Sequence, residues 1–220
     1  MKKTSFAMSL AGAILLPSAV HAVTLVTYDF NTAGTVLNAS ADVTGSTVSN
    51  GGGLSNFSDA GNPGGGYATP VLQVNPHGSA SNITGAVAND SFFELTLTIN
   101  AGVYQLDELA LQVTRGGNSS TERGFTLRSD LTGTTDLFQV NAVPSVRTTF
   151  TDYTIDLTAF SEFQAIDDEV TFQFYIHTPA TGNSLEFDNL VFSGDPVPEP
   201  TGVLLSALSA MALLRRSRRD

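Results

Sequence analysis

The sequence contains neither cysteine nor tryptophan. The absence of cysteine excludes disulfide bonds, thiolate metal ligands and a cysteine nucleophile. The absence of tryptophan removes the largest aromatic face with which a protein stacks on a ligand ring. Any such stacking therefore falls to smaller rings, and the tyrosines that offer them are Tyr28, Tyr67, Tyr104, Tyr153 and Tyr175.

Positive charge is also scarce in the body of the chain. Between Val23 and Pro198 there is no lysine, and four arginines stand against 19 aspartates and glutamates, a net formal charge of −15. A surface of this sign repels nucleic acid phosphates, so DNA or RNA binding is disfavoured. It is compatible with an extracellular location, with divalent cations and with neutral ligands. The arginines are Arg115, Arg123, Arg128 and Arg147.

The first 22 residues have the three parts of a secretory signal peptide. Lys2 and Lys3 precede an apolar stretch over residues 6–16, and small residues lead to a cut between Ala22 and Val23. As a helix the apolar stretch reaches only about 16 Å, against roughly 30 Å for a hydrocarbon core, so it is too short for a lasting anchor. We predict a signal helix over 1–22 and export through the Sec machinery.

Strand-like alternation fills the segment that follows. In residues 92–99 the apolar Phe93, Leu95, Leu97 and Ile99 alternate with polar residues, and residues 170–177 repeat the pattern. Such alternation is typical of antiparallel sheets with one buried face. Weaker alternation, separated by turn residues, marks residues 26–30, 108–114, 124–129, 136–140, 152–157 and 184–192.

These segments predict an all-β domain over 23–195, a two-sheet antiparallel β-sandwich of jelly-roll type. The glycine-rich residues 46–70 predict a long surface loop, in which Phe57 and Tyr67 hold the loop on the sandwich or contact a ligand. Residues 159–166 predict at most one helical turn. Most of the tyrosines fall at alternating strand positions, where we expect them to pack inside.

Catalytic motifs are missing from the body. His77 and His177 stand alone, and we interpret both as surface residues without a metal. Residues 185–190 begin like the Glu-x-Asp-x-x-Glu strand of retaining β-glucanases, but Leu190 and Val191 occupy the place of the second glutamate. Without that acid/base partner the retaining mechanism cannot operate, so we predict that the protein is not an enzyme.

The same stretch, SLEFDNLVFSG, resembles the closing strand of carbohydrate-binding-module jelly rolls. In those modules an aspartate of this strand often binds Ca²⁺ together with groups of the first strand. The resemblance implies a structural calcium held by Asp29, Asn31 and Asp188, since Ca²⁺ prefers such oxygen ligands. The alternative is that Asp188 and Asn189 only stabilise a bend through backbone hydrogen bonds.

The C-terminus joins a Pro-Glu-Pro sequence, an uncharged segment over 201–214 and an arginine cluster. As a helix this segment reaches about 21 Å. The layout closely resembles the PEP-CTERM sorting signal of Gram-negative bacteria, which an exosortase recognises. The resemblance implies a sorting region over 196–220 with a short transmembrane helix, in which the recognition and stop residues are Pro198, Glu199, Pro200, Arg215, Arg216, Arg218 and Arg219.

These features predict an exported protein of the outer surface or extracellular matrix, attached only transiently to the inner membrane. The leading hypothesis is a structural or adhesive component linked to exopolysaccharide and biofilm. The alternative is a lectin like a carbohydrate-binding module, with a structural calcium. An exposed aromatic platform favours the lectin, whereas a featureless sandwich favours the structural role.

Overall fold

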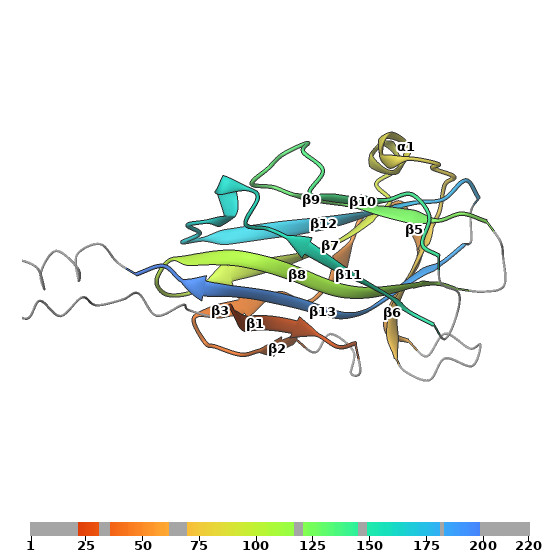
Figure 1. Ribbon diagram of the computed structural model, residues 1–220. Helices are drawn as coiled ribbons and strands as arrows, with labels where there is room; N and C mark the ends of the chain where they lie inside the picture. The colour runs from red at the N-terminus through yellow and green to blue at the C-terminus, as the bar shows by residue number, and fades with distance from the viewer. Residues whose placement is uncertain are drawn as a thin grey trace, which may run out of the picture.

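The computed structural model describes residues 22–30, 36–61, 70–116, 121–144, 149–180 and 183–198. Their strands form two antiparallel sheets packed face to face (Figure 1). The seven-stranded sheet contains β11 (Thr151–Asp156), β8 (Tyr104–Arg115), β13 (Leu185–Pro196), β1 (Val23–Tyr28) and β2 (Val36–Asn38) in that order, with β6 (Val71–Pro76) beside β13 and β5 (Leu54–Gly61) beside β6.

The six-stranded sheet forms the second layer. Its order is β10 (Phe138–Val140), β9 (Gly124–Ser129), β12 (Glu169–His177), β7 (Phe92–Ile99) and β3 (Val43–Gly45), and β4 (Ser49–Asn50) also pairs with β7. The chain crosses repeatedly between the layers, as in a jelly roll. A short helix, α1 (Ile83–Ala88), precedes β7, and one 3-10 turn, η1 (Ser161–Phe163), precedes β12.

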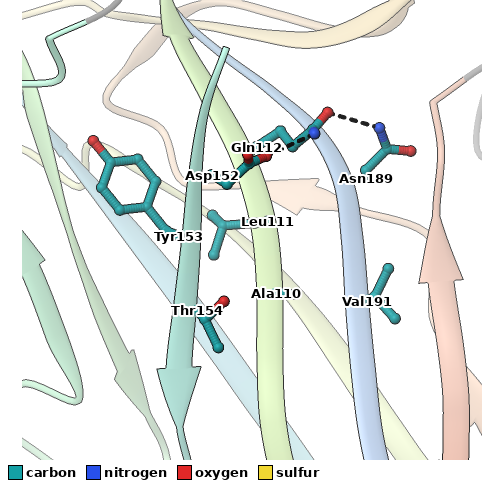
Figure 2. Close-up of a pocket in the computed structure, with 8 residues that line it drawn as sticks. All are labelled: Ala110, Leu111, Gln112, Asp152, Tyr153, Thr154, Asn189 and Val191. Atoms are coloured by element: carbon teal, nitrogen blue, oxygen red, sulfur yellow. Dashed lines mark hydrogen bonds between the residues drawn. The ribbon is translucent and has the colours of Figure 1, made fainter.

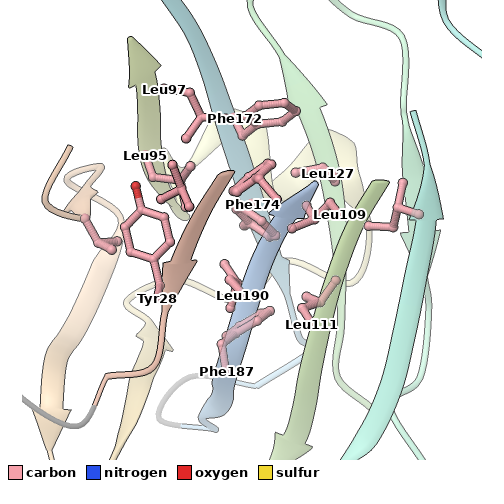
Figure 3. Packing of buried hydrophobic residues seen from close by; sticks show 14 of the residues in the cluster. Tyr28, Leu95, Leu97, Leu109, Leu111, Leu127, Phe172, Phe174, Phe187 and Leu190 are labelled. Carbon is pink, nitrogen blue, oxygen red and sulfur yellow. The ribbon is translucent and has the colours of Figure 1, made fainter. Parts of the chain in front are cut away.

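Phenylalanine rings fill much of the space between the sheets (Figure 3). Phe93 stacks on Phe174 with ring centroids 4.5 Å apart, and Phe187 of the opposite sheet meets Phe93 edge-on at 4.9 Å. All three side chains are completely buried. Stacked and edge-on contacts of this kind add stability beyond the burial of apolar area. The inward side chains of alternating strands therefore make one continuous core.

The predicted β-sandwich is confirmed, and one local prediction of secondary structure is wrong. Residues 46–70 are not one loop, because β4 and β5 lie within them and β5 pairs with β6. Phe57 packs against the core at the edge of this pair, and Tyr67 lies outside the described residues. Helix α1 was not expected from the sequence. Asn82 caps it by accepting a hydrogen bond from the Gly85 N–H at 3.0 Å.

The start of the first strand, β1, and the end of the last strand, β13, lie at the same end of the sandwich (Figure 1). Val23, the first residue after the predicted signal cut, pairs with Gly194 of β13. The last backbone bond of the domain runs from the Val197 N–H to the Val103 carbonyl, at 2.8 Å. Both predicted processing regions therefore join the domain at the same end.

The predicted terminal segments themselves fall outside the described residues. These are the signal helix up to residue 21, Glu199 and Pro200 of the sorting motif, the 201–214 segment and the arginine cluster. Pro198 is described and exposed. Among the described residues, no helix is both long enough and apolar enough to span a bilayer.

Candidate functional site

The outer face of the six-stranded sheet carries two aromatic side chains side by side. Phe92 of β7 and Tyr175 of β12 are directly paired across the strands. Their ring centroids are 5.3 Å apart and the rings are tilted by 50°. Their neighbours Phe93 and Phe174 point inward and are fully buried, whereas Phe92 and Tyr175 are only half-buried. We call these two residues the aromatic pair.

A row of polar side chains runs across the strands beside the aromatic pair. It consists of Arg128 of β9, Gln173 of β12, Glu94 of β7 and Ser49 of β4, which are neighbours in the sheet register. Gln173 Nε2 donates to Glu94 Oε2 at 3.0 Å, and Ser49 Oγ donates to Glu94 Oε1 at 3.2 Å. We call these four residues the polar row.

The aromatic pair and the polar row are joined through Tyr175. Its hydroxyl donates to Gln173 Oε1 at 3.0 Å, and the guanidinium carbon of Arg128 lies 5.7 Å from the centre of its ring. Arg128 is held in turn by Asp136, with Nε 2.6 Å from Oδ1. These contacts fix the ring and the polar groups relative to each other before any ligand binds, which lowers the cost of ordering them.

Elements on two sides frame this face. Helix α1 and the connection between β9 and β10 both rise on the outer side of the six-stranded sheet (Figure 1). Asp136 lies in that connection and holds Arg128. Asp90 follows α1 and has a left-handed backbone with φ 52°. Such a conformation is several-fold enriched in aspartate among non-glycine residues.

Burial and charge both act on the titratable groups of this face. Burial raises the pKa of the Tyr175 hydroxyl, the Arg128 charge lowers it, and the Asp90 and Glu94 charges raise it. His177, at the end of β12, is 2% exposed, so its predicted surface position is wrong. Burial lowers the pKa of the His177 imidazole below 6.5. The hydrogen bond with the Phe125 backbone and the charge of Asp136 act in the opposite direction and raise this pKa, but less than burial lowers it.

The tyrosine prediction is right at three of the four described positions, and Tyr67 lies outside the described residues. Tyr28 and Tyr104 are buried, and Tyr153 packs at the edge of the core. Tyr175 faces outward instead, and Phe92 beside it was not considered. A signal for both is present in the sequence. Each aromatic residue occupies the alternating positions that otherwise hold polar residues in its own strand. These polar residues are Glu94, Thr96 and Thr98 in β7, and Thr171 and Gln173 in β12.

The residues predicted to hold calcium come together only in part. Burial raises the pKa of Asp188 to about 6, the hydrogen bond from the Asn189 N–H lowers it, and the Asp29 charge raises it. Asp29 and Asp188 are therefore within electrostatic reach, as neighbouring strands predict. Asn31 lies outside the described residues. Within the described ranges, no group of three His, Asp or Glu side chains is placed to hold a metal, so the calcium site stays a prediction.

The alternative role of Asp188 and Asn189 agrees with the structure. Asp188 Oδ1 accepts a hydrogen bond from the Asn189 N–H at 2.8 Å. Asn189 has a left-handed φ of 49° at a bulge in β13. The bulge carries the Asn189 side chain out of the sheet, where Nδ2 donates to Gln112 Oε1 at 2.9 Å.

A shallow groove of about 320 Å³ lies at this bulge, on the seven-stranded sheet (Figure 2). Ala110 and Val191 are paired across the strands in its lining. Gln112 forms one side, with Nε2 donating to Asp152 Oδ1 at 2.7 Å. This groove belongs to the other sheet and has Tyr153 in its lining, so the described residues offer two separate surfaces, and the aromatic pair lies on the six-stranded one.

Comparisons with known proteins give a general likeness of fold. No protein-family model matches the chain, and no curated protein matches it. One solved carbohydrate-binding module of family 29 is 16% identical with a TM-score of 0.40, covering 79% of this chain and 93% of its own. The cleaved adhesin domain of Lys-gingipain from Porphyromonas gingivalis is 14% identical with a TM-score of 0.44, covering 79% and 99%. These likenesses are too distant to carry an argument about function.

Proposed function

We propose that this is an exported, non-catalytic β-sandwich protein that binds polysaccharide through the outer face of the six-stranded sheet. The observation that carries the proposal is the aromatic pair fixed beside the polar row. Sugar rings have apolar faces rimmed by hydroxyl groups. They therefore suit a site with an aromatic surface next to hydrogen-bonding side chains.

The chemistry of the face favours binding over catalysis. Glu94 already accepts bonds from Ser49 and Gln173, and Arg128 is paired with Asp136. These side chains form a fixed hydrogen-bonding surface. A glycosidase instead needs two carboxyl groups placed on either side of a scissile bond. The proposed role in the extracellular matrix is therefore attachment to polysaccharide, with the sandwich as an adhesive or structural unit.

Export and sorting complete the proposal and are supported by the sequence. The signal peptide precedes Val23, and the Pro-Glu-Pro sequence begins at Pro198, one residue after the last described backbone bond. Cleavage at either predicted site would therefore leave the strands of the sandwich intact. Mass spectrometry of the form secreted by the native host measures both ends at once. We expect a mature chain starting at Val23 and ending near Pro198, and a full-length, membrane-bound product would contradict the sorting role.

Binding is tested with the purified full chain against immobilised polysaccharides. We expect retention on at least one neutral or amino-sugar polymer, and loss of retention when Tyr175→Ala removes one ring of the pair. Tyr153→Ala is the matched control, because that ring belongs to the seven-stranded sheet, where it packs at the edge of the core and lines the groove. Failure of the unsubstituted protein to bind any polysaccharide would refute the proposed function.

A further inference from the structure

Negative charge surrounds the aromatic pair. Asp90 precedes Phe92 by two residues and Glu94 follows it by two, so both carboxylates are close to this ring along the chain. Asp90 is exposed, and Glu94 is half-buried on the outward face of β7. Burial is the largest cause of the raised pKa of the Tyr175 hydroxyl; among the nearby charges, Arg128 lowers this pKa, and Asp90 and Glu94 raise it. A ligand on the aromatic pair therefore lies within the field of two carboxylates.

The positive charge of Arg128 acts against these two carboxylates and is itself offset by Asp136. Its Nε is 2.6 Å from Asp136 Oδ1, so the guanidinium is engaged by a carboxylate of its own. The four groups Arg128, Asp136, Asp90 and Glu94 leave two net negative charges around the aromatic pair. Asp130, which borders the same sheet face, adds further negative charge. A polymer of uronic acids or sulfated sugars would be repelled there.

Glu94 also keeps room to accept hydrogen bonds. Each of its oxygens takes one bond from the protein, from Ser49 and from Gln173. An ionised carboxylate has about four acceptor positions, so about two remain for a ligand. Bonds from an ammonium group to a carboxylate are roughly twice as strong as those between neutral groups. The Arg128 guanidinium already lies over the Tyr175 ring, so an ammonium gains further attraction from the ring electrons of Phe92.

We propose that the ligand of this face is a hexosamine polymer with free amino groups, which bind as ammonium between the aromatic pair and Glu94. The inference rests on the proposed function and narrows its ligand to one chemical class. The ring of the amino sugar stacks on Phe92 and Tyr175, and its ammonium group lies toward the carboxylates.

The test compares two ligands that differ only in this group. Isothermal titration of the full chain uses a glucosamine hexamer and an N-acetylglucosamine hexamer at low ionic strength. We expect the free amine to bind at least about ten-fold more tightly, and the difference to shrink as salt screens the charges. Glu94→Gln should reduce the difference several-fold, because it removes the negative charge and keeps an acceptor oxygen in nearly the same place.

Glu169→Gln is the matched control for charge. Glu169, the first residue of β12, lies on the same sheet face and accepts a hydrogen bond from Thr98, which is four positions along β7 from Glu94. We expect this variant to keep most of the preference, since its carboxylate is away from the rings. Equal affinity for the two hexamers, or a Glu94→Gln variant that keeps the full preference, would overturn the inference and leave the proposed function standing. Failure of both hexamers and of every neutral polysaccharide to bind would overturn both.

Discussion

Phe92 and Phe93 are consecutive residues with opposite roles, and exchanging each for alanine separates binding from stability. Phe93 is completely buried, stacked on Phe174 and edge-on to Phe187. Removing a buried phenylalanine side chain costs about 3–5 kcal/mol of unfolding free energy. For a domain of this size, that lowers Tm by about 6–20 °C. Phe92 is half-buried, and its main aromatic partner is Tyr175.

Phe92→Ala should therefore cost only about 1 kcal/mol, the scale of one aromatic pair contact, and about 2–4 °C in Tm. Its effect on binding is larger. We expect the affinity for polysaccharide to fall at least about ten-fold, which corresponds to about 1.4 kcal/mol. Thermal unfolding by circular dichroism measures the first quantity, and isothermal titration below the lower Tm measures the second.

The two variants must diverge for the reasoning to hold. Phe93→Ala should remain able to bind wherever it is still folded, and Phe93→Leu provides a milder core change if the alanine variant does not fold. If folded Phe92→Ala binds polysaccharide as tightly as the unsubstituted protein, the outer face of the six-stranded sheet is not the site. If both alanine variants lower Tm equally, the inward and outward assignment along β7 is wrong.

Three further predictions concern other parts of the fold. Because the pKa of His177 is lowered in the folded state, the unfolded chain binds more protons, and the unfolding free energy should decrease as pH falls through 6.5. His177→Gln should flatten that slope in urea titrations, and an unchanged slope would assign it to other groups. Calcium should raise Tm relative to a chelator if Asp29 and Asp188 bind it, with the effect lost in Asp188→Asn. Equal Tm values with calcium and with the chelator would show that these residues hold no calcium. Filling the seven-stranded groove by Ala110→Leu should leave polysaccharide binding unchanged in titration, whereas a loss would move the site to that groove.

Alternation in the sequence was sufficient to predict the strands at the centre of the sandwich. The predicted bounds of Phe92–Ile99 are those of β7, and residues 170–177 miss only the first residue of β12. The edge strand β5 was missed because it holds few large apolar residues and gains its backbone partners only from β6. Helix α1 was missed because six residues are too short to show a helical period, although the Asn82 cap signals its start.

The site depends on a pairing that one strand cannot reveal. Phe92 and Tyr175 are far apart in the sequence, and only the antiparallel register of β7 and β12 places them opposite each other. Considered alone, each is one more aromatic residue in a strand, and such residues are expected to lie in the core. What distinguishes them is their phase, since both occupy the polar side of an alternating strand. A search for aromatic residues in that phase would have found both, but not that they are neighbours.

The position of the aromatic pair is consistent with attachment at the end of the sandwich. β1 begins and β13 ends at the same end of the molecule (Figure 1), through the Val23–Gly194 pairing. Both strands belong to the seven-stranded sheet, whereas the aromatic pair lies on the outer face of the opposite sheet. The chain therefore reaches Pro198 from the seven-stranded sheet, the layer opposite the one that carries the aromatic pair. A domain held at that end can then present the face with the aromatic pair sideways to a polymer.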